Sequence, residues 1–189
     1  MLKGLVAGFI LGVAVVAAAT YYYFASGKAP VAVADPMMPF EIKMANMALD
    51  AHIEKQHVGE SPLPADEPDL LAGAGVYRKN CAMCHGVPGH PVDYVNMMFP
   101  KPTQLFEGKG VTDDPASESY WKAANGIRLS GMPSFKEKLT ITELWQVSQL
   151  VAHANEISES VKNVLVSPPS VSASSPLPSP PPSQRSAPK

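Results

Sequence analysis

Cys81-Ala82-Met83-Cys84-His85 contains both cysteines of the 189-residue chain and one of its five histidines. Residues i and i+3 lie on one face of a helical turn, so both sulfur atoms can reach the same edge of a planar cofactor. The imidazole of the next residue can then swing beneath the metal of that cofactor. C-x-x-C-H is the attachment signature for c-type haem, and this stretch predicts one covalently attached haem with His85 as an iron ligand.

Three other interpretations of the two thiols are weaker. A redox-active C-x-x-C pair is expected in a βαβ context, of which the sequence gives no sign. A structural zinc site needs four ligands and usually a second Cys/His pair, and the chain has no further cysteine. Two thiols that merely fill a core would not need the adjacent His85. We therefore predict that the cofactor is haem c.

Composition limits what the rest of the chain can do. The net charge is −2, and residues 70–157 carry eight basic and eight acidic side chains. They do not form the concentrated basic face that nucleic-acid binding needs, so we expect no nucleic-acid partner. These 88 residues are also too few for a multidomain enzyme with a large substrate cleft. A domain of this size buries little apolar surface, and a cofactor is expected to complete its core.

Residues 1–27 are predicted to form a membrane anchor. From Leu5 to Phe24 there are 20 residues without a charge, which as a helix span about 30 Å, the thickness of a bilayer core. The tyrosines at the end of this run are typical of an interfacial belt. The alternative is a cleaved signal peptide, with a small-x-small site at Ala17–Ala19 or Ala32–Ala34. The first site lies inside the apolar run and the second beyond its end, so we expect the anchor to be retained.

Helical patterns dominate the sequence after the anchor, and strand signals are nearly absent. In the acidic neck, residues 28–69, apolar residues at helical spacing predict an amphipathic helix from Pro39 to about Gln56. Residues 70–157 are predicted to form a small all-α domain of three or four helices joined by Gly/Pro loops. Residues 158–189 are predicted to hold a short helix and then a disordered Pro/Ser-rich tail.

Local signals place the helices of the compact domain. A helix is expected from Leu70 to Asn80, and four prolines without periodicity predict a loop between Pro88 and Thr103. Asp114-Pro115 is a predicted N-cap and first position of a helix that Asn125-Gly126 ends. Thr140-Ile-Thr-Glu143 has the pattern of a capping box at the start of the last long helix.

The region from Leu70 to Asn155 resembles the class I cytochromes c. Gly73, Tyr77 and Cys81 keep that family's Gly-xxx-aromatic-xxx-Cys spacing, and Leu144-Trp145 falls where its C-terminal helix crosses the first. Gly131-Met132-Pro133-Ser134-Phe135 resembles the family's distal loop. The resemblance implies that Met132, 47 residues after His85, is the sixth iron ligand.

The resemblance also implies roles for residues around the ligands. The segment Pro100-Lys101-Pro102 resembles the loop whose carbonyl accepts the N–H of the proximal imidazole. Arg128, just before the distal loop, has two readings that stay open, a partner of a haem propionate or a plain surface arginine. The chain has nine methionines, but Met132 alone lies in a Gly-Met-Pro loop beyond a helix. His153 and His90 are the alternative sixth ligands.

A haem iron with two protein ligands has no open position for a substrate, and a thioether ligand raises its potential. We therefore expect an electron carrier rather than an enzyme. The expected protein is a membrane-anchored monohaem cytochrome that exchanges electrons with a quinol-oxidising complex and with a terminal oxidase or reductase. Its haem domain is expected on the periplasmic side of a bacterial inner membrane. The alternatives are a fixed cytochrome c subunit of a larger membrane complex and a gas-binding haem sensor.

Overall fold

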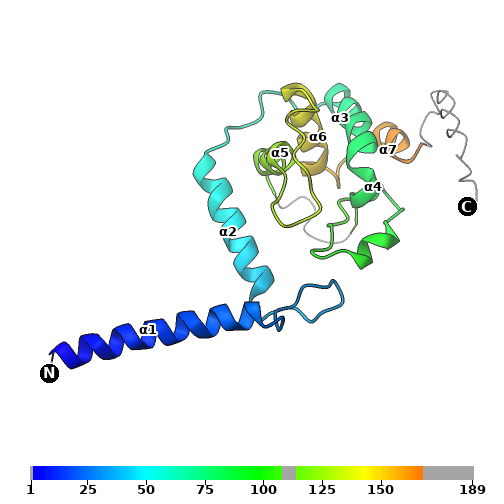
Figure 1. Ribbon diagram of the computed structural model, residues 1–189. Coiled ribbons are helices and arrows are strands. Elements are labelled where there is room, and N and C mark those ends of the chain that lie inside the picture. The colour runs from blue at the N-terminus through cyan, green and yellow to red at the C-terminus, as the bar shows by residue number, and fades with distance from the viewer. Residues whose placement is uncertain (1, 108–113, 168–189) are drawn as a thin grey trace, which may run out of the picture.

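The computed structural model describes residues 2–107 and 114–167, and within these ranges the regular structure is entirely helical (Figure 1). The elements are α1 (Leu2–Ala25), α2 (Glu41–Gln56), α3 (Glu67–Asn80), α4 (Ala82–His85), the 3-10 helix η1 (Asp93–Met97), α5 (Ala116–Asn125), α6 (Ile141–Ala152) and α7 (Glu159–Val166). The predicted all-α class is confirmed. The tail from residue 168 onward, predicted to be disordered, lies outside the described residues.

The compact domain is organised around the crossing of α3 and α6. Gly73 lies at this crossing, where an added Cβ would meet the Gln146 carbonyl oxygen at 2.3 Å, so only a glycine lets the two helices approach this closely. The α3 face that packs here contributes Ala74 and Tyr77, and α6 contributes Leu150, all fully buried. These residues form the core that carries the attachment turn.

The core continues past the predicted end of the domain at residue 157. Val161 and Leu165 of α7 are buried in the same cluster as Leu70 and Tyr77 of α3. The Arg78 guanidinium donates to the Val164 carbonyl oxygen at 3.0 Å, and so ties the end of α7 to α3. The eight-residue α7 therefore belongs to the compact domain, because its apolar face packs against α3.

The predicted helix starts are correct in one case and wrong in two. At Thr140 the hydroxyl accepts from the Glu143 N–H and the Glu143 carboxylate accepts from the Thr140 N–H, which is the predicted capping box. Helix α3 begins at Glu67 rather than Leu70, because Asp66 accepts from the Asp69 N–H and caps it there. Helix α5 is preceded by Pro115 without a side-chain cap, since the Asp114 carboxylate pairs instead with Lys122 at 2.6 Å.

The neck helix α2 lies beside the compact domain and leads back to α1 (Figure 1). Helix α1 is long and apolar enough to cross a membrane, with a mean hydropathy of 2.2 and none of its residues buried against the rest of the protein. Helix α2 begins at Glu41, after a connection of 15 residues that follows α1. The chain thus places a candidate anchor, an exposed helix and a packed domain in that order.

Candidate functional site

The predicted attachment motif forms a tight turn at the end of α3. Cys81 ends that helix, and its N–H donates to the Tyr77 carbonyl oxygen at 2.7 Å. The N–H groups of Cys84 and His85 both donate to the Cys81 carbonyl oxygen, which starts the four-residue helix α4. Both thiols are free and half-buried. The turn therefore presents two unjoined sulfur atoms and one imidazole from five consecutive residues.

The imidazole of His85 is fixed through one of its two ring nitrogens. Its Nδ1 lies 2.7 Å from the carbonyl oxygen of Thr103. Because a carbonyl only accepts, Nδ1 carries the proton and Nε2 keeps its lone pair for a metal ion. Burial holds the pKa of His85 below its usual value, against the opposing effect of the Thr103 contact, and this favours the neutral ring that iron needs.

The carbonyl that accepts from His85 belongs to Thr103, one residue past the predicted segment. Pro100 is exposed and Pro102 half-buried, and neither carbonyl is the partner of the ring. The reason is the path of the chain, which runs back along the attachment turn only after Pro102. There the Leu105 N–H donates to the His85 carbonyl oxygen at 3.1 Å. The two prolines direct the chain into this path.

Gln104 holds this returning segment in place, a role that could not be predicted from the sequence. Its Nε2 donates to the Cys84 carbonyl oxygen at 3.0 Å, and its Oε1 accepts from the Val92 N–H at 2.9 Å. An added Cβ at Gly86 would lie 2.7 Å from the same Oε1, so the turn and the amide fit only with a glycine there. A glutamine in a loop gives no sequence signal, because its partners are backbone groups distant in the chain.

Two tyrosines support the same turn. The buried hydroxyl of Tyr77 donates to the Gly86 carbonyl oxygen at 2.9 Å, and burial raises the pKa of Tyr77, so the phenol remains a donor. The more exposed Tyr94 hydroxyl donates to the Met83 carbonyl oxygen at 2.6 Å and lies 3.6 Å from the Cys84 sulfur. Tyr94 comes from η1, within the segment predicted to be loop. We call residues 81–105, with these contacts, the proximal side.

The predicted Met132 loop is held by the end of α5. We call residues 127–135 the distal loop. Gly126 ends α5 at φ +70°, and an added Cβ there would meet the backbone of Pro133 and Ser134 at 2.7 Å. The Met132 carbonyl oxygen accepts from the Ile127 N–H at 3.1 Å, which folds the loop back on itself. These contacts fix the backbone of the loop, and the Met132 side chain is half-buried.

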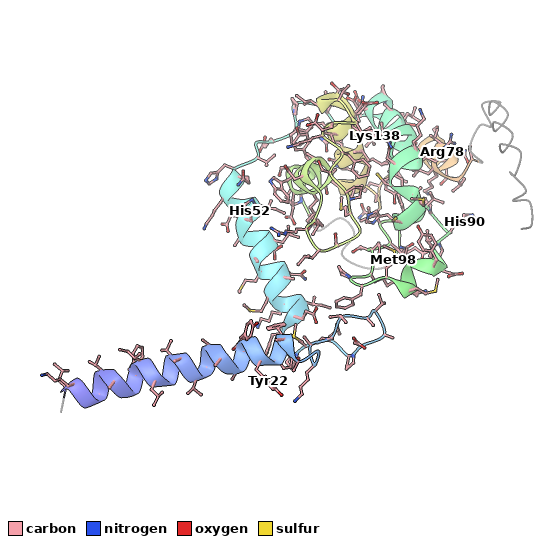
Figure 2. The ribbon with its side chains drawn as sticks, viewed as in Figure 1. Tyr22, His52, Arg78, His90, Met98 and Lys138 are labelled. Carbon is pink, nitrogen blue, oxygen red and sulfur yellow. The ribbon has the colours of Figure 1, made fainter. Side chains whose placement is uncertain are left out.

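The proximal side and the distal loop meet at Met98. A Cβ added to Gly131 would lie 2.8 Å from the Met98 methyl carbon, so a larger residue would displace that side chain. Figure 2 labels Met98 in the lower part of the compact domain and His90 to the right of it. Arg128 and His90 are both exposed. The ring of His153, just after α6, contacts the carbonyl oxygen of Gln149 in that helix.

The donor set fits a covalently bound haem. Burial, with the neighbouring Cys84, raises the pKa of Cys81 to about 12, so this group is a protonated thiol. Among the described residues there is no group of three or more His, Cys, Asp or Glu side chains that could hold a metal ion alone. Two thiols, one neutral imidazole and a methionine loop are the groups that a haem c can use.

Comparisons with known proteins agree with this geometry. Residues 68–151 match the family model described as "Cytochrome C oxidase, cbb3-type, subunit III". The chain is also similar to cytochrome c6 of Limnospira maxima, at 31% identity over 88 residues, which are 47% of this chain and 96% of that protein. No solved structure matches. The residues that match the family model extend from the start of α3 to the end of α6 and include neither α1 nor α2.

Proposed function

We propose that this chain, which belongs to the class I c-type cytochromes, carries single electrons between membrane oxidoreductases while its own anchor holds it at the bilayer. Membership of this family supports haem-based electron transfer. The observation that carries the proposal is the contact between His85 Nδ1 and the Thr103 carbonyl oxygen, which leaves Nε2 free on a turn that also presents two thiols.

The roles of the site residues follow from this proposal. Cys81 and Cys84 hold the cofactor by thioether bonds, His85 is the proximal ligand and Met132 is the distal one. Arg128, which is exposed in the distal loop, is the proposed partner of a haem propionate. Pro100 and Pro102 direct the chain that brings Thr103 to His85. When bound, haem c supplies one-electron chemistry between the ferric and ferrous states. The Thr103 contact holds the His85 ring in place, so that little has to move at this ligand when the charge changes.

The anchor proposal rests on α1. Its 24 residues are enough to cross a bilayer, and none of them packs against the compact domain. The proposal puts the domain on the periplasmic side of a bacterial inner membrane, because haem attachment to this motif implies the oxidising side. The proposed partners are a quinol-oxidising complex as donor and a terminal oxidase or reductase as acceptor.

A second candidate has support of its own. The family model that matches residues 68–151 is described as a subunit of a cbb3-type oxidase, which favours a fixed cytochrome subunit within a larger complex. Extraction in mild detergent followed by size measurement separates the two functions. A free carrier migrates alone, whereas a subunit migrates with its complex and with oxidase activity.

The optical spectrum tests the proposed ligands. The oxidised protein should show the weak far-red band of sulfur bound to iron, and the reduced protein should not bind carbon monoxide. A carbon monoxide complex of the unmodified protein would instead favour a gas-binding haem with a displaceable ligand. A pyridine haemochrome spectrum should give one haem per chain with both vinyl groups saturated.

A further inference from the structure

The neck helix α2 has two apolar faces on opposite sides. Met44 and Ile53 are nine residues apart, which is two and a half turns of an α-helix, so their side chains leave the helix in opposite directions. Ile42 and Leu49 share the side of Ile53, and Met47 and Ala51 share the side of Met44. We call the first set the inner face and the second set, with Phe40 just before the helix, the outer face.

The compact domain covers the inner face toward the end of α2, whereas Ile42 at the start of the helix is 45% exposed. Ile53 is only 8% exposed, and the His52 ring lies edge-on to Trp121 of α5 with 5.4 Å between the ring centroids. The linker that follows is tied to α6, because the Gln149 amide donates to the Leu63 carbonyl oxygen at 2.9 Å. Figure 2 labels His52 on the side of α2 that is nearer the domain. Packing against the domain therefore accounts for the buried Ile53 of the inner face but not for the apolar residues of the outer face.

The outer face lies open. Phe40 is 72% exposed, Met44 56% and Met47 54%, and Ala48 and Ala51 between the turns are exposed as well. The connection before the helix adds further open apolar side chains, those of Val31, Val33 and Met37. An unbroken row of this kind is not needed for the fold, and it would be costly to leave in water.

Chain continuity indicates what covers the outer face. Helix α1 ends in Tyr21-Tyr22-Tyr23, and Lys28 lies over the Tyr22 ring at 5.8 Å. The connection to α2 is an ordered turn, since the Asp35 carboxylate accepts from two backbone N–H groups at 2.8 Å and Glu41 accepts from Met38. In Figure 1 the start of α2 lies at the end of α1, and α2 then runs across the direction of α1.

From these observations we infer that the outer face of α2 lies on the lipid surface beside the anchor, with the compact domain resting on the inner face. The inference depends on the proposed membrane anchor. Residues 28–56 carry three lysines against four acidic residues, so burial of Phe40, Met44 and Met47 has to supply the attraction rather than charge. Weak attraction is enough, because α1 already holds α2 at a high effective concentration next to the bilayer. The neck would thereby fix how the haem domain is oriented over the membrane.

Thiol labelling of the full-length, haem-loaded protein tests the inference. Both native cysteines are occupied by haem, so a single introduced cysteine is the only reactive thiol. Met44→Cys and Met47→Cys probe the outer face, Asp50→Cys the polar side of the same helix, and Val166→Cys an exposed apolar position on α7. Each variant is placed at one copy per nanodisc of phosphatidylethanolamine and phosphatidylglycerol and treated with a maleimide polymer that cannot enter lipid. Val15→Cys, inside α1, reports whether the anchor itself spans the disc.

We expect labelling at positions 44 and 47 to be at least about tenfold slower than at 50 and 166, whatever the phosphatidylglycerol content. Equal labelling rates at positions 44, 47, 50 and 166, with Val15→Cys protected, would overturn the inference about α2 but not the proposed membrane anchor. A reactive Val15→Cys would overturn both. Protection only with two copies per disc would assign the face to a second copy, and protection only in native membranes would assign it to a partner protein; either result overturns the lipid proposal.

Discussion

The proximal side and the distal loop hold their ligands by different means. On the proximal side the ligand ring itself is fixed, by the 2.7 Å contact between His85 Nδ1 and the Thr103 carbonyl oxygen. In the distal loop only the backbone is fixed, by the 3.1 Å contact from Ile127 N–H to the Met132 carbonyl oxygen and by Ser134, whose hydroxyl donates to Ala124 at 2.6 Å. The histidine is therefore preorganised as a ligand, whereas the methionine is only brought within reach.

This difference separates the two ligands in what they contribute. With the proposed ligands, loss of the proximal turn would remove covalent attachment and part of the core together. Loss of Met132 would remove one weak bond from a loop that other contacts keep folded. The following predictions test whether the proximal side controls folding and the distal loop controls the chemistry of the iron.

The largest effect is expected from Cys81→Ala combined with Cys84→Ala. Without attached haem, the half-buried residues around the site lose the group that completes their core, and little stable domain should form. Circular dichroism during thermal unfolding should show loss of the cooperative transition. A haem-free variant that stays helical and unfolds cooperatively would contradict this prediction.

Met132→Ala should leave the domain folded and change its iron chemistry. The far-red band should disappear, carbon monoxide should bind to the reduced form, and the potential should fall by on the order of 0.1 V, within the roughly 0.8 V range that axial ligands cover. Potentiometry and optical spectra measure all three. Met98→Ala is the matched control, because Met98 contacts the same loop at Gly131 without being the predicted ligand. If the band survives in Met132→Ala and is lost in Met98→Ala, the distal ligand is Met98.

Gln104→Leu should weaken the proximal contact without removing a ligand. The Cys84 carbonyl oxygen and the Val92 N–H lose their partner, which should cost about 1–3 kcal/mol of stability. A looser Thr103 carbonyl makes His85 a poorer electron donor to iron, so the potential should rise, by up to about 59 mV for a tenfold change in the equilibrium. Gln149→Leu is the control, since its amide contacts the neck linker and not the site. A stability loss in Gln104→Leu with an unchanged potential would show that Gln104 is structural only.

The smallest effect is expected away from both ligands, at the capping box of α6. The Thr140 N–H and hydroxyl, which both donate to the Glu143 carboxylate, hold the pKa of Glu143 below its usual value of 4.5. A carboxyl group with a lowered pKa in the folded state stabilises that state above its usual pKa, and this contribution is lost as the pH falls below 4.5. Glu143→Gln should remove this part of the acid dependence of unfolding and leave the optical spectrum unchanged. A changed spectrum would mean that α6 influences the iron site more directly than the contacts indicate.

Features with a short-range signal could be predicted from the sequence. The attachment turn, the capping box at Thr140 and the end of α5 at Gly126 all depend on residues within five positions of each other. The carbonyl that accepts from His85 was expected within residues 100–102 and lies one residue further on, at Thr103. The Gln104 amide could not be predicted, because its partners are backbone groups 12 and 20 residues away. The packing of α7 was missed for the same reason, since its contact with Arg78 spans 86 residues.

The crossing at Gly73 has a consequence for how the protein is made. The 72 residues between Gly73 and Gln146 contain the whole cofactor site, so the crossing closes a loop around it. Closing a flexible loop of that length costs about 4 kcal/mol of chain entropy, which a chain without cofactor has little packing to offset. A chain that is still open at this crossing would leave Cys81 and Cys84 accessible for the proposed haem attachment. The crossing would then form after attachment and enclose the site.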